Sequence, residues 1–262
     1  MSRMSKRMNM IVGENDWIIL YFSEKRRYIY QVSDKEISLN EGIVNLGNLI
    51  GKEYGGVFKT HLGVPFRVVK ASLLDVILEK FKRKTQIIYP KDLGCIIIAA
   101  NIKPGSRVIE AGTGSGVLTA IIANYIQPSG RVFTYEIRRE FYETAIRNLR
   151  RIALDKFVEF KLEDIKEAKL EKNVDSVVLD LPDPWNVLQN VSEALRSGGK
   201  IVCFVPTINQ AEKTHLTLKE NGFIFVETKE VLERKYEVKK GATRPYTLMR
   251  GHTGYIVSAT KI

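Results

Sequence analysis

The sequence predicts an α/β fold, in which a largely parallel sheet is covered by helices on both faces, preceded by a small β domain. From Thr85 onward, apolar strand-like runs alternate with helical stretches, which is the pattern of a parallel sheet with crossover helices. Before Ser72, short strand-like runs are separated by recurrent glycines, as in a small sandwich or barrel. We therefore expect a first domain at 1–70 and a second at 71–262.

Length and composition agree with a globular fold of one or two domains. The chain has 262 residues, of which 44% are hydrophobic and 27% charged, so disordered and collagen-like classes are excluded. No apolar run approaches the ~18 residues of a membrane-spanning helix, and no secretory signal core follows the basic N-terminus. Cys95 and Cys203 lie in apolar runs, so we expect neither a disulfide framework nor a metal site, and a cytoplasmic location.

The charge of the chain is strongly positive and unevenly distributed. There are 41 basic and 30 acidic residues, which gives a formal net charge of +11. Residues 1–84 hold 15 basic and 9 acidic residues and residues 229–262 hold 8 and 3, whereas the middle is near neutral. Excess positive charge at both flanks indicates a polyanionic partner such as nucleic acid, although it would also serve solubility alone.

The elements of the first domain begin with a hairpin. Trp17–Phe22 and Arg27–Val32 are rich in β-forming residues and flank the polar turn at 23–26. The apolar period then changes from strand to helix spacing at Ser72, which with Asp75 forms a capping-box-like start. This change of period is the reason for placing the domain boundary here.

In the second domain, strands and helices follow in turn. Helices are expected at Arg138–Ala153 and Pro184–Arg196, among others. The last strand, Tyr255–Ile262, is separated from its predecessor only by a basic and polar stretch at 233–250, so it is expected to run antiparallel. The preceding strands are expected at Arg107–Ala111, Arg131–Glu136, Val158–Glu163, Val174–Asp180, Lys200–Val205 and Phe223–Val231.

A glycine-rich turn, GTGSG at 112–116, follows the first of these strands and leads into a helix. Glycines there let the backbone turn tightly and approach a ligand. Such a turn alone is a weak signal, since it fits a dinucleotide site or merely a tight connection. Its spacing, however, is G-x-G-x-G and lacks the third glycine of the dinucleotide fingerprint.

Three carboxylates favour S-adenosylmethionine over a dinucleotide at this turn. Glu110 ends the first strand, where it would repel a pyrophosphate but suit an amino-acid ammonium group. Glu136 ends the second strand, where it can accept both ribose hydroxyls, and Asp164 ends the third, where it can accept from an adenine amine. The simple alternative for Glu136 and Asp164 is solvation of a strand end.

The fourth strand ends in DLPDPW at 180–185, which is the candidate reaction site. A carboxylate at Asp180 can accept a hydrogen bond from an exocyclic amine and favour a cationic product. That chemistry suits methylation of a ring nitrogen of adenine, because the methylated base becomes positive. The alternative is that Asp180 caps the following helix, for which Asp183 is the better placed residue.

Four stretches together resemble the tRNA adenine-N1 methyltransferases that modify position 58 of the T-loop, in their single-subunit prokaryotic form. The glycine loop is shared by many methyltransferases, whereas the other three stretches together are specific. The stretches are IYPKD at 88–92, EAGTGSG at 110–116, DLPDPW at 180–185 and GHTGY at 251–255.

The resemblance implies a Rossmann-like class I S-adenosylmethionine-dependent methyltransferase. Its sheet would have seven strands with an antiparallel last strand, and its small N-terminal β domain would help to hold tRNA. The protein would be a homotetramer. Whether position 57 is modified as well as 58 is left open.

The resemblance also implies roles for individual residues. Asp180 would be catalytic, and Tyr89 would lie beside the target base next to Gln86. Independently of the resemblance, Arg244 and His252 are expected to contact RNA because they lie in the basic C-terminal stretch. Cofactor contacts would come from Glu110, Gly112, Gly114, Ser115, Gly116, Val117, Leu118, Glu136, Glu163, Asp164 and Asp180.

Other functions stay open at the level of sequence. One is a protein isoaspartate O-methyltransferase on the same scaffold, which the DLPDPW turn and the basic flanks disfavour. Another is a nicotinamide-dependent dehydrogenase, which the glycine spacing disfavours. The third is a tRNA-binding module without catalysis, which the intact glycine loop disfavours.

Overall fold

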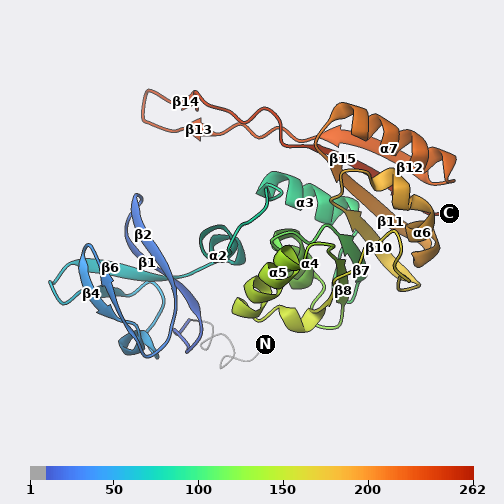
Figure 1. Cartoon of the computed structure of the whole chain (residues 1–262). Helices are drawn as coiled ribbons and strands as arrows, with labels where there is room; N and C mark the ends of the chain where they lie inside the picture. Colours follow the sequence, from blue (N-terminus) through green and yellow to red (C-terminus); the bar gives the residue numbers. More distant parts are fainter. Residues whose placement is uncertain (1–9) are drawn as a thin grey trace. The chain divides into compact units, whose positions relative to one another are not determined.

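The structure, a computed structural model, describes residues 10–262 and divides the chain into two compact units (Figure 1). The first unit ends at Phe81 and the second begins at Lys82, so the expected boundary at residue 70 lies too early. The reason is helix α2 (Leu73–Lys80), which contacts strand β2 (Arg26–Gln31) and therefore belongs to the first unit. Its predicted capping box is present.

The first unit is built from two small antiparallel sheets. The predicted hairpin is confirmed, since β1 (Trp17–Ser23) pairs antiparallel with β2. Its larger sheet has the order β2-β1-β6-β5, and side chains from both sheets share one apolar core. The remaining elements are β3 (Glu36–Leu39), β4 (Gly42–Asn45), the 3₁₀ turn η1 (Gly47–Leu49), β5 (Val57–Lys59) and β6 (Pro65–Lys70).

The second unit contains a seven-stranded sheet with the order β12-β15-β11-β10-β7-β8-β9. The five strands from β11 to β9 are parallel, and β15 is antiparallel to both of its neighbours, as predicted. The strands are β7 (Arg107–Ala111), β8 (Arg131–Tyr135), β9 (Val158–Lys161), β10 (Val174–Leu179), β11 (Leu195–Val205), β12 (Ile224–Glu230) and β15 (Tyr255–Thr260).

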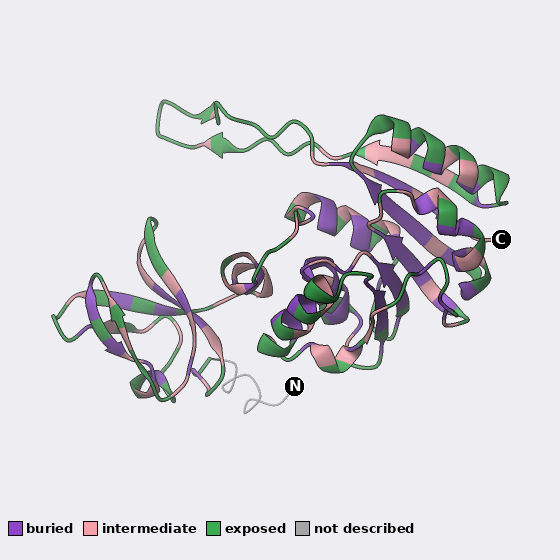
Figure 2. Cartoon of the chain, in the orientation of Figure 1, coloured by how far each residue is buried: buried purple, intermediate pink, exposed green. Residues whose placement is uncertain are grey.

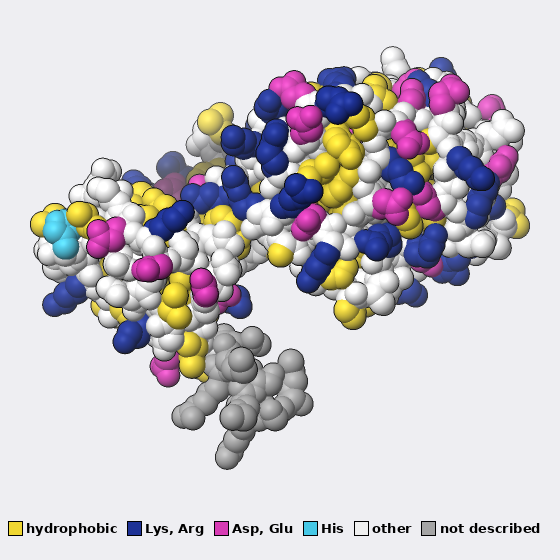
Figure 3. Space-filling model, turned by 60° about the horizontal axis from the view of Figure 1, so that its bottom comes forward, with side chains coloured by type: hydrophobic (Ala, Val, Ile, Leu, Met, Phe, Trp, Pro, Cys, Tyr) yellow, Lys and Arg dark blue, Asp and Glu magenta, His cyan; other side chains and the backbone are white. Residues whose placement is uncertain are grey.

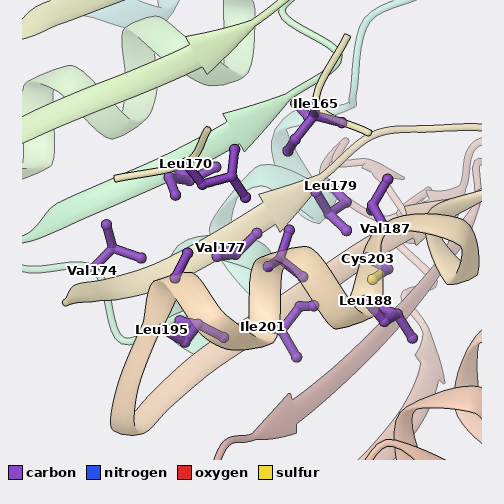
Figure 4. Close-up of a cluster of buried hydrophobic side chains, with 14 of the residues drawn as sticks. Ile165, Leu170, Val174, Val177, Leu179, Val187, Leu188, Leu195, Ile201 and Cys203 are labelled. Carbon is purple, nitrogen blue, oxygen red and sulfur yellow. The ribbon is translucent and has the colours of Figure 1, made fainter. Parts of the chain in front are cut away.

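Helices cover both faces of this sheet. On one face, α6 and α7 pack on a core that includes Val177, Leu188 and Ile201 (Figure 4). Alternate strand residues, such as Val108 and Val178, are equally buried but point to the other face, under α3, α4 and α5. The helices are α3 (Pro90–Ala99), α4 (Val117–Tyr125), α5 (Arg139–Arg151), α6 (Leu188–Ala194) and α7 (Ile208–Glu220).

One local prediction was wrong in its extent. The helix expected at 184–196 is instead a 3₁₀ turn, η3 (Pro184–Val187), followed by the short α6, and β11 starts already at Leu195. The basic and polar stretch at 233–250, for which no element was predicted, forms an exposed arm in which β13 (Tyr236–Glu237) pairs with β14 (Arg244–Pro245) (Figure 2). A 3₁₀ turn, η2 (Asp155–Phe157), precedes β9.

Two expected absences can be compared with the described residues. Within 10–262, no helix is long and apolar enough to cross a membrane. In the same range, no group of three or more potential metal-ligating side chains was found, and both cysteines are free thiols.

Candidate cofactor and substrate site

The glycine loop after β7 lies directly against the turn that follows β10. Gly112 has φ +90°, and a Cβ there would lie 2.1 Å from the carbonyl oxygen of Asp180. In the other direction, the Asp180 amide donates to the Ala111 carbonyl at 2.9 Å. Only glycine permits this close approach, which brings the two sequence motifs together at the carboxyl end of the sheet.

Two cavities open at this end of the sheet, on either side of Glu136. The first, of about 340 Å³, lies over the glycine loop and reaches Gln86 and Asp180. The second, of about 470 Å³, is lined by Glu163 and Asp164. The two cavities share five lining residues: Gly112, Glu136, Ile137, Leu181 and Pro182. An elongated ligand with two chemically different ends fits this arrangement.

Glu136 is fixed at the junction of the two cavities. Its Oε2 accepts from the Gly114 amide and its Oε1 from the Arg138 amide, both at 2.9 Å. A carboxylate has further lone pairs beyond these two bonds, so it can still accept from a diol. Asp164 similarly accepts from the Lys166 amide at 2.9 Å and remains exposed in the second cavity.

Glu110 is completely buried beneath the loop and does not line either cavity. Among the described residues, neither of its carboxylate oxygens has a hydrogen-bond partner. Burial raises the pKa of Glu110 to about 8, although the nearby hydroxyl groups of Thr119 and Thr134 act in the opposite direction; the charges of Asp180 and Glu136 reinforce the rise. A buried carboxylate without a partner beside a glycine loop is suited to a cationic amine.

Asp180 lines the first cavity, and the pKa of its carboxyl group lies above that of an ordinary aspartate. Burial, reinforced by the charge of Glu136, raises the pKa of Asp180 to about 7. Among residues 10–262 its carboxylate forms no hydrogen bond, so it does not cap the following turn. Asp183 does not cap with its side chain either, because its carboxylate accepts instead from the side chains of Lys166 at 2.8 Å and Asn186 at 2.6 Å.

Tyr89 and Gln86 lie between this site and another cavity. Gln86 lines the first cavity, and its amide donates to the Tyr89 hydroxyl at 3.3 Å. Tyr89 itself lines a cavity of about 300 Å³ at the base of the β13–β14 arm, which we call the arm cavity. The guanidinium group of Arg250 lies over the Tyr89 ring at 4.5 Å from its centre.

The structure does not bring Arg244 and His252 into these cavities. Arg244 lies on the arm and pairs with Glu237 at 3.1 Å. His252 Nδ1 lies 2.6 Å from a Glu230 carboxylate oxygen, and its Nε2 lies 2.7 Å from the Pro206 carbonyl. The Glu230 carboxylate, followed by this carbonyl, raises the pKa of His252. Because both ring nitrogens face acceptors, these surroundings favour the protonated ring, which is unfavourable for a general base.

Sequence reasoning missed a clamp that joins two of the four family-like stretches. Lys91 donates to Asp92, Thr253 and the Val231 carbonyl at 2.6–2.8 Å, and Thr253 donates to Asp92 at 2.7 Å. Asp92 is completely buried, and this network holds the start of α3 against the base of the arm. A Lys-Asp pair followed far along the chain by a threonine gives no local signal.

The donor set fits S-adenosylmethionine on three observations of the structure. The buried carboxylate of Glu110 has no hydrogen-bond partner and is therefore suited to a cationic group. Glu136, at the junction of the cavities, has free lone pairs that can accept from ribose hydroxyls. The second cavity offers Asp164 to a base amine, beside apolar lining residues such as Ile137 and Ile165. Gly114, Ser115, Val117 and Leu118 line the first cavity, as expected for cofactor contacts, whereas Gly116 caps α4 just behind it.

Comparison with known proteins gives matches over most of the chain. Residues 76–244 match the family described as tRNA methyltransferase complex GCD14 subunit. The chain is 39% identical to the tRNA (adenine(57)-N(1)/adenine(58)-N(1))-methyltransferase TrmI of Methanocaldococcus jannaschii, over 89% of this chain and 91% of the relative. It is 33% identical to the tRNA (adenine(58)-N(1))-methyltransferase TrmI of Thermus thermophilus, over 91% and 95%.

Two solved structures are similar to this chain over nearly its whole length. Aquifex aeolicus tRNA methyltransferase TrmI superposes with a TM-score of 0.79 at 33% identity, covering 96% of this chain and 99% of that one. A Thermotoga maritima protein described as an S-adenosylmethionine-dependent O-methyltransferase superposes with a TM-score of 0.86 at 36% identity, covering 97% and 96%. The fold is therefore that of the S-adenosylmethionine-dependent methyltransferases. Since the family match spans more than half of the chain and both TrmI relatives exceed 30% identity over most of their length, the chain belongs to this tRNA methyltransferase family.

Proposed function

We propose that this protein transfers a methyl group from S-adenosylmethionine to N1 of the adenine at position 58 in the T-loop of tRNA. The observation that carries the proposal is Asp180, an unpaired carboxylate on the wall of the cavity that the glycine loop forms. The TrmI relatives are named for this reaction, one of them at position 57 as well. The enzyme class follows from the family.

The cofactor, when bound, supplies an electrophilic methyl group on a sulfonium. The residues of this chain then have three tasks: they bind the cofactor, admit the base and stabilise the positive charge that develops on it. Glu136 and Asp164 would hold the ribose and adenine ends of the cofactor, and the carboxylate of Glu110, buried beneath the loop, would favour its ammonium end electrostatically. The target adenine lies within folded RNA, so it must be flipped out to reach the first cavity.

Asp180 orients the target base and stabilises the product. Its carboxylate accepts a hydrogen bond from the exocyclic amine of adenine, which places the ring nitrogen toward the methyl group. As N1 becomes alkylated the ring gains positive charge, and the nearby anion stabilises that charge in a cavity of low dielectric. The N1 lone pair is free at neutral pH, so the reaction needs no strong base before attack.

Other residues are assigned to RNA binding. Tyr89 stacks on the RNA at the entrance, and Gln86 links it to the wall of the cavity beside Asp180. Arg244 and His252 contribute positive charge near the arm. The first unit helps to hold tRNA, and the protein acts as a homotetramer in the cytoplasm.

Transfer of labelled methyl groups from S-adenosylmethionine to an unmodified tRNA transcript tests the proposal. The modified nucleotides are located by reverse-transcription stops, which N1-methyladenine produces because methylation blocks base pairing. A stop at position 58, alone or with one at 57, is the expected result. Methylation of a protein or small molecule, with none of tRNA, would contradict it and favour an O-methyltransferase.

A further inference from the structure

The arm cavity, described above beside Tyr89, has a lining unlike that of the cofactor cavities. Its wall comes from the start of α3 and from two segments of the arm, 233–235 and 246–250. Tyr246 and Leu248 lie on the wall and remain largely exposed, at 54% and 91%. Four cationic side chains and one carboxylate, that of Glu233, complete the lining of this space of about 300 Å³. The Glu233 carboxylate lies 3.9 Å from the Lys235 ammonium group, so these two charges offset each other.

Two of the cations in the arm cavity are not neutralised. Lys91 lies 2.8 Å from the buried carboxylate of Asp92, so its charge is compensated. Arg234 and Arg250, in contrast, form no ion pair with any residue of 10–262. Two unpaired guanidinium groups at one cavity suit an anion, because the planar fork of arginine matches two oxygens of a phosphate.

The contact between Arg250 and Tyr89 leaves the arginine ready for such an anion. The guanidinium carbon lies 4.5 Å from the ring centre, within the range of cation–π attraction. Among residues 10–262 the guanidinium N–H groups form no hydrogen bond, so they are available to donate to an anion. Tyr246 provides a second aromatic surface, on which a nucleobase can stack.

We propose that the arm cavity binds a nucleotide that neighbours the methylated adenosine, with its phosphate on Arg250 and Arg234 and its base against Tyr246. This inference rests on the proposed function. The hydrogen bond between Gln86 and Tyr89 joins the cavity that holds Asp180 to the arm cavity. An RNA strand can therefore place one nucleotide at Asp180 and an adjacent one in the arm cavity.

The clamp described above gives the arm cavity its shape. Thr253 and the Val231 carbonyl flank the arm in sequence, and both are held by Lys91 at 2.6 Å. Arg250 lies three residues before Thr253, and Tyr89 lies two residues before Lys91, so the clamp joins the two backbone segments that carry this pair. Such anchoring of the backbone reduces the entropic cost of binding a ligand between the segments.

Titration of an unmodified tRNA transcript into the full-length protein at several salt concentrations tests the inference. Arg250→Gln removes the charge at nearly constant size, Arg250→Lys keeps the charge but loses the planar fork, and Lys240→Gln is the matched control. Lys240 is exposed on the same arm and does not line the arm cavity. Binding of S-adenosylmethionine to each variant serves as the check on folding.

We expect Arg250→Gln to weaken tRNA binding roughly tenfold or more and to reduce the slope of log affinity against log salt by roughly 0.7–0.9. Arg250→Lys should keep the wild-type slope with an intermediate affinity, and Lys240→Gln should bind like the wild type. If Arg250→Gln and Lys240→Gln bind tRNA equally tightly with equal slopes, the arm cavity is not a nucleotide site. The titration measures tRNA binding and needs no turnover. A wild-type protein that binds tRNA but transfers no methyl group to it would therefore contradict the proposed function and leave the nucleotide site in the arm cavity intact.

Discussion

At the scale of the residue, Asp180 and Glu110 share one buried environment that links cofactor binding to pH. Burial, aided by neighbouring carboxylates, raises the pKa of Asp180 to about 7 and that of Glu110 to about 8. The two groups titrate as a coupled pair, and both are partly protonated at neutral pH. A cationic ligand favours their ionised forms, so binding of the sulfonium cofactor releases protons.

The pH dependence of catalysis follows from these two groups. We expect kcat/KM for S-adenosylmethionine to rise as the pH increases from 6 to 9, because this parameter reports ionisation of the free enzyme. Steady-state methyl transfer to tRNA, measured across this range at saturating tRNA, provides the profile. In Glu110→Gln the upper part of the rise should disappear. A flat profile in the wild type would contradict the assignment of Glu110 and Asp180 to cofactor binding.

Whereas kcat/KM should rise with pH, the free energy of unfolding of the cofactor-free protein should fall with pH because of Glu110. The folded-state pKa of about 8 lies above the ordinary value of 4.5, so ionisation of Glu110 destabilises the native state increasingly as the pH rises through this interval. We expect Glu110→Gln to raise the melting temperature relative to the wild type at pH 9, and to have a smaller effect at pH 5. Thermal unfolding of both proteins at the two pH values measures this. An equal shift at both would show that Glu110 does not ionise within the fold.

Asp180 should affect turnover more than cofactor affinity. Loss of one group that stabilises charge in the transition state commonly reduces the rate by roughly 10²–10³. Asp180→Ala should show this loss in single-turnover methyl transfer to tRNA while still binding S-adenosylmethionine. Asp155→Ala serves as the control, since Asp155 is a surface residue whose carboxylate lies 3.8 Å from Arg150. Near-wild-type turnover of Asp180→Ala would remove Asp180 from its proposed role.

At the scale of the element, the loop between β7 and α4 has room for its backbone only because its first glycine has no side chain. A Cβ on Gly112 would lie 2.1 Å from the Asp180 carbonyl, and φ of +90° disfavours other residues as well. We expect Gly112→Ala to lower the melting temperature and to abolish cofactor binding in a titration. Gly94→Ala in α3 is the control, because no atom lies within 4 Å of a Cβ there, and it should be neutral or slightly stabilising.

The elements that were predictable from sequence are those with a clear pattern of apolar residues. β7 and β10 are largely buried, and each holds a short cluster of apolar residues typical of a central parallel strand, although β7 also contains Glu110 and β10 contains Asp175 and Ser176. The β13–β14 arm escaped prediction because its two-residue strands are exposed and polar. The location of Tyr89 in the arm cavity, and the clamp around Asp92, depend on contacts between residues about 160 positions apart, which no local pattern encodes.

At the scale of the whole molecule, the charge is less segregated than the sequence suggests. On the face shown in Figure 3, lysine and arginine side chains are interspersed with acidic ones, without one continuous basic surface. Many cations on this protein are already paired, as Arg244 is with Glu237. Affinity for RNA therefore depends on particular unpaired groups rather than on the net charge of +11.

The proposed homotetramer is a prediction at this scale. One chain has a mass of 29.8 kDa, so we expect light scattering after size-exclusion chromatography to give about four times that value. The mass should not change over a tenfold range of protein concentration. A mass equal to that of one chain would contradict the tetramer without affecting the assignment of Asp180.

The position of β15 between β11 and β12 has a consequence for synthesis on the ribosome. Within the part of the chain that the structure describes, β12 pairs only with β15, although it is made some thirty residues earlier. Until β15 emerges from the exit tunnel, β12 has no strand to pair with and the edge of β11 is open. An open strand edge can pair with other polypeptide chains and so promote aggregation. The arrival of β15 therefore both pairs β12 and covers the open edge of β11.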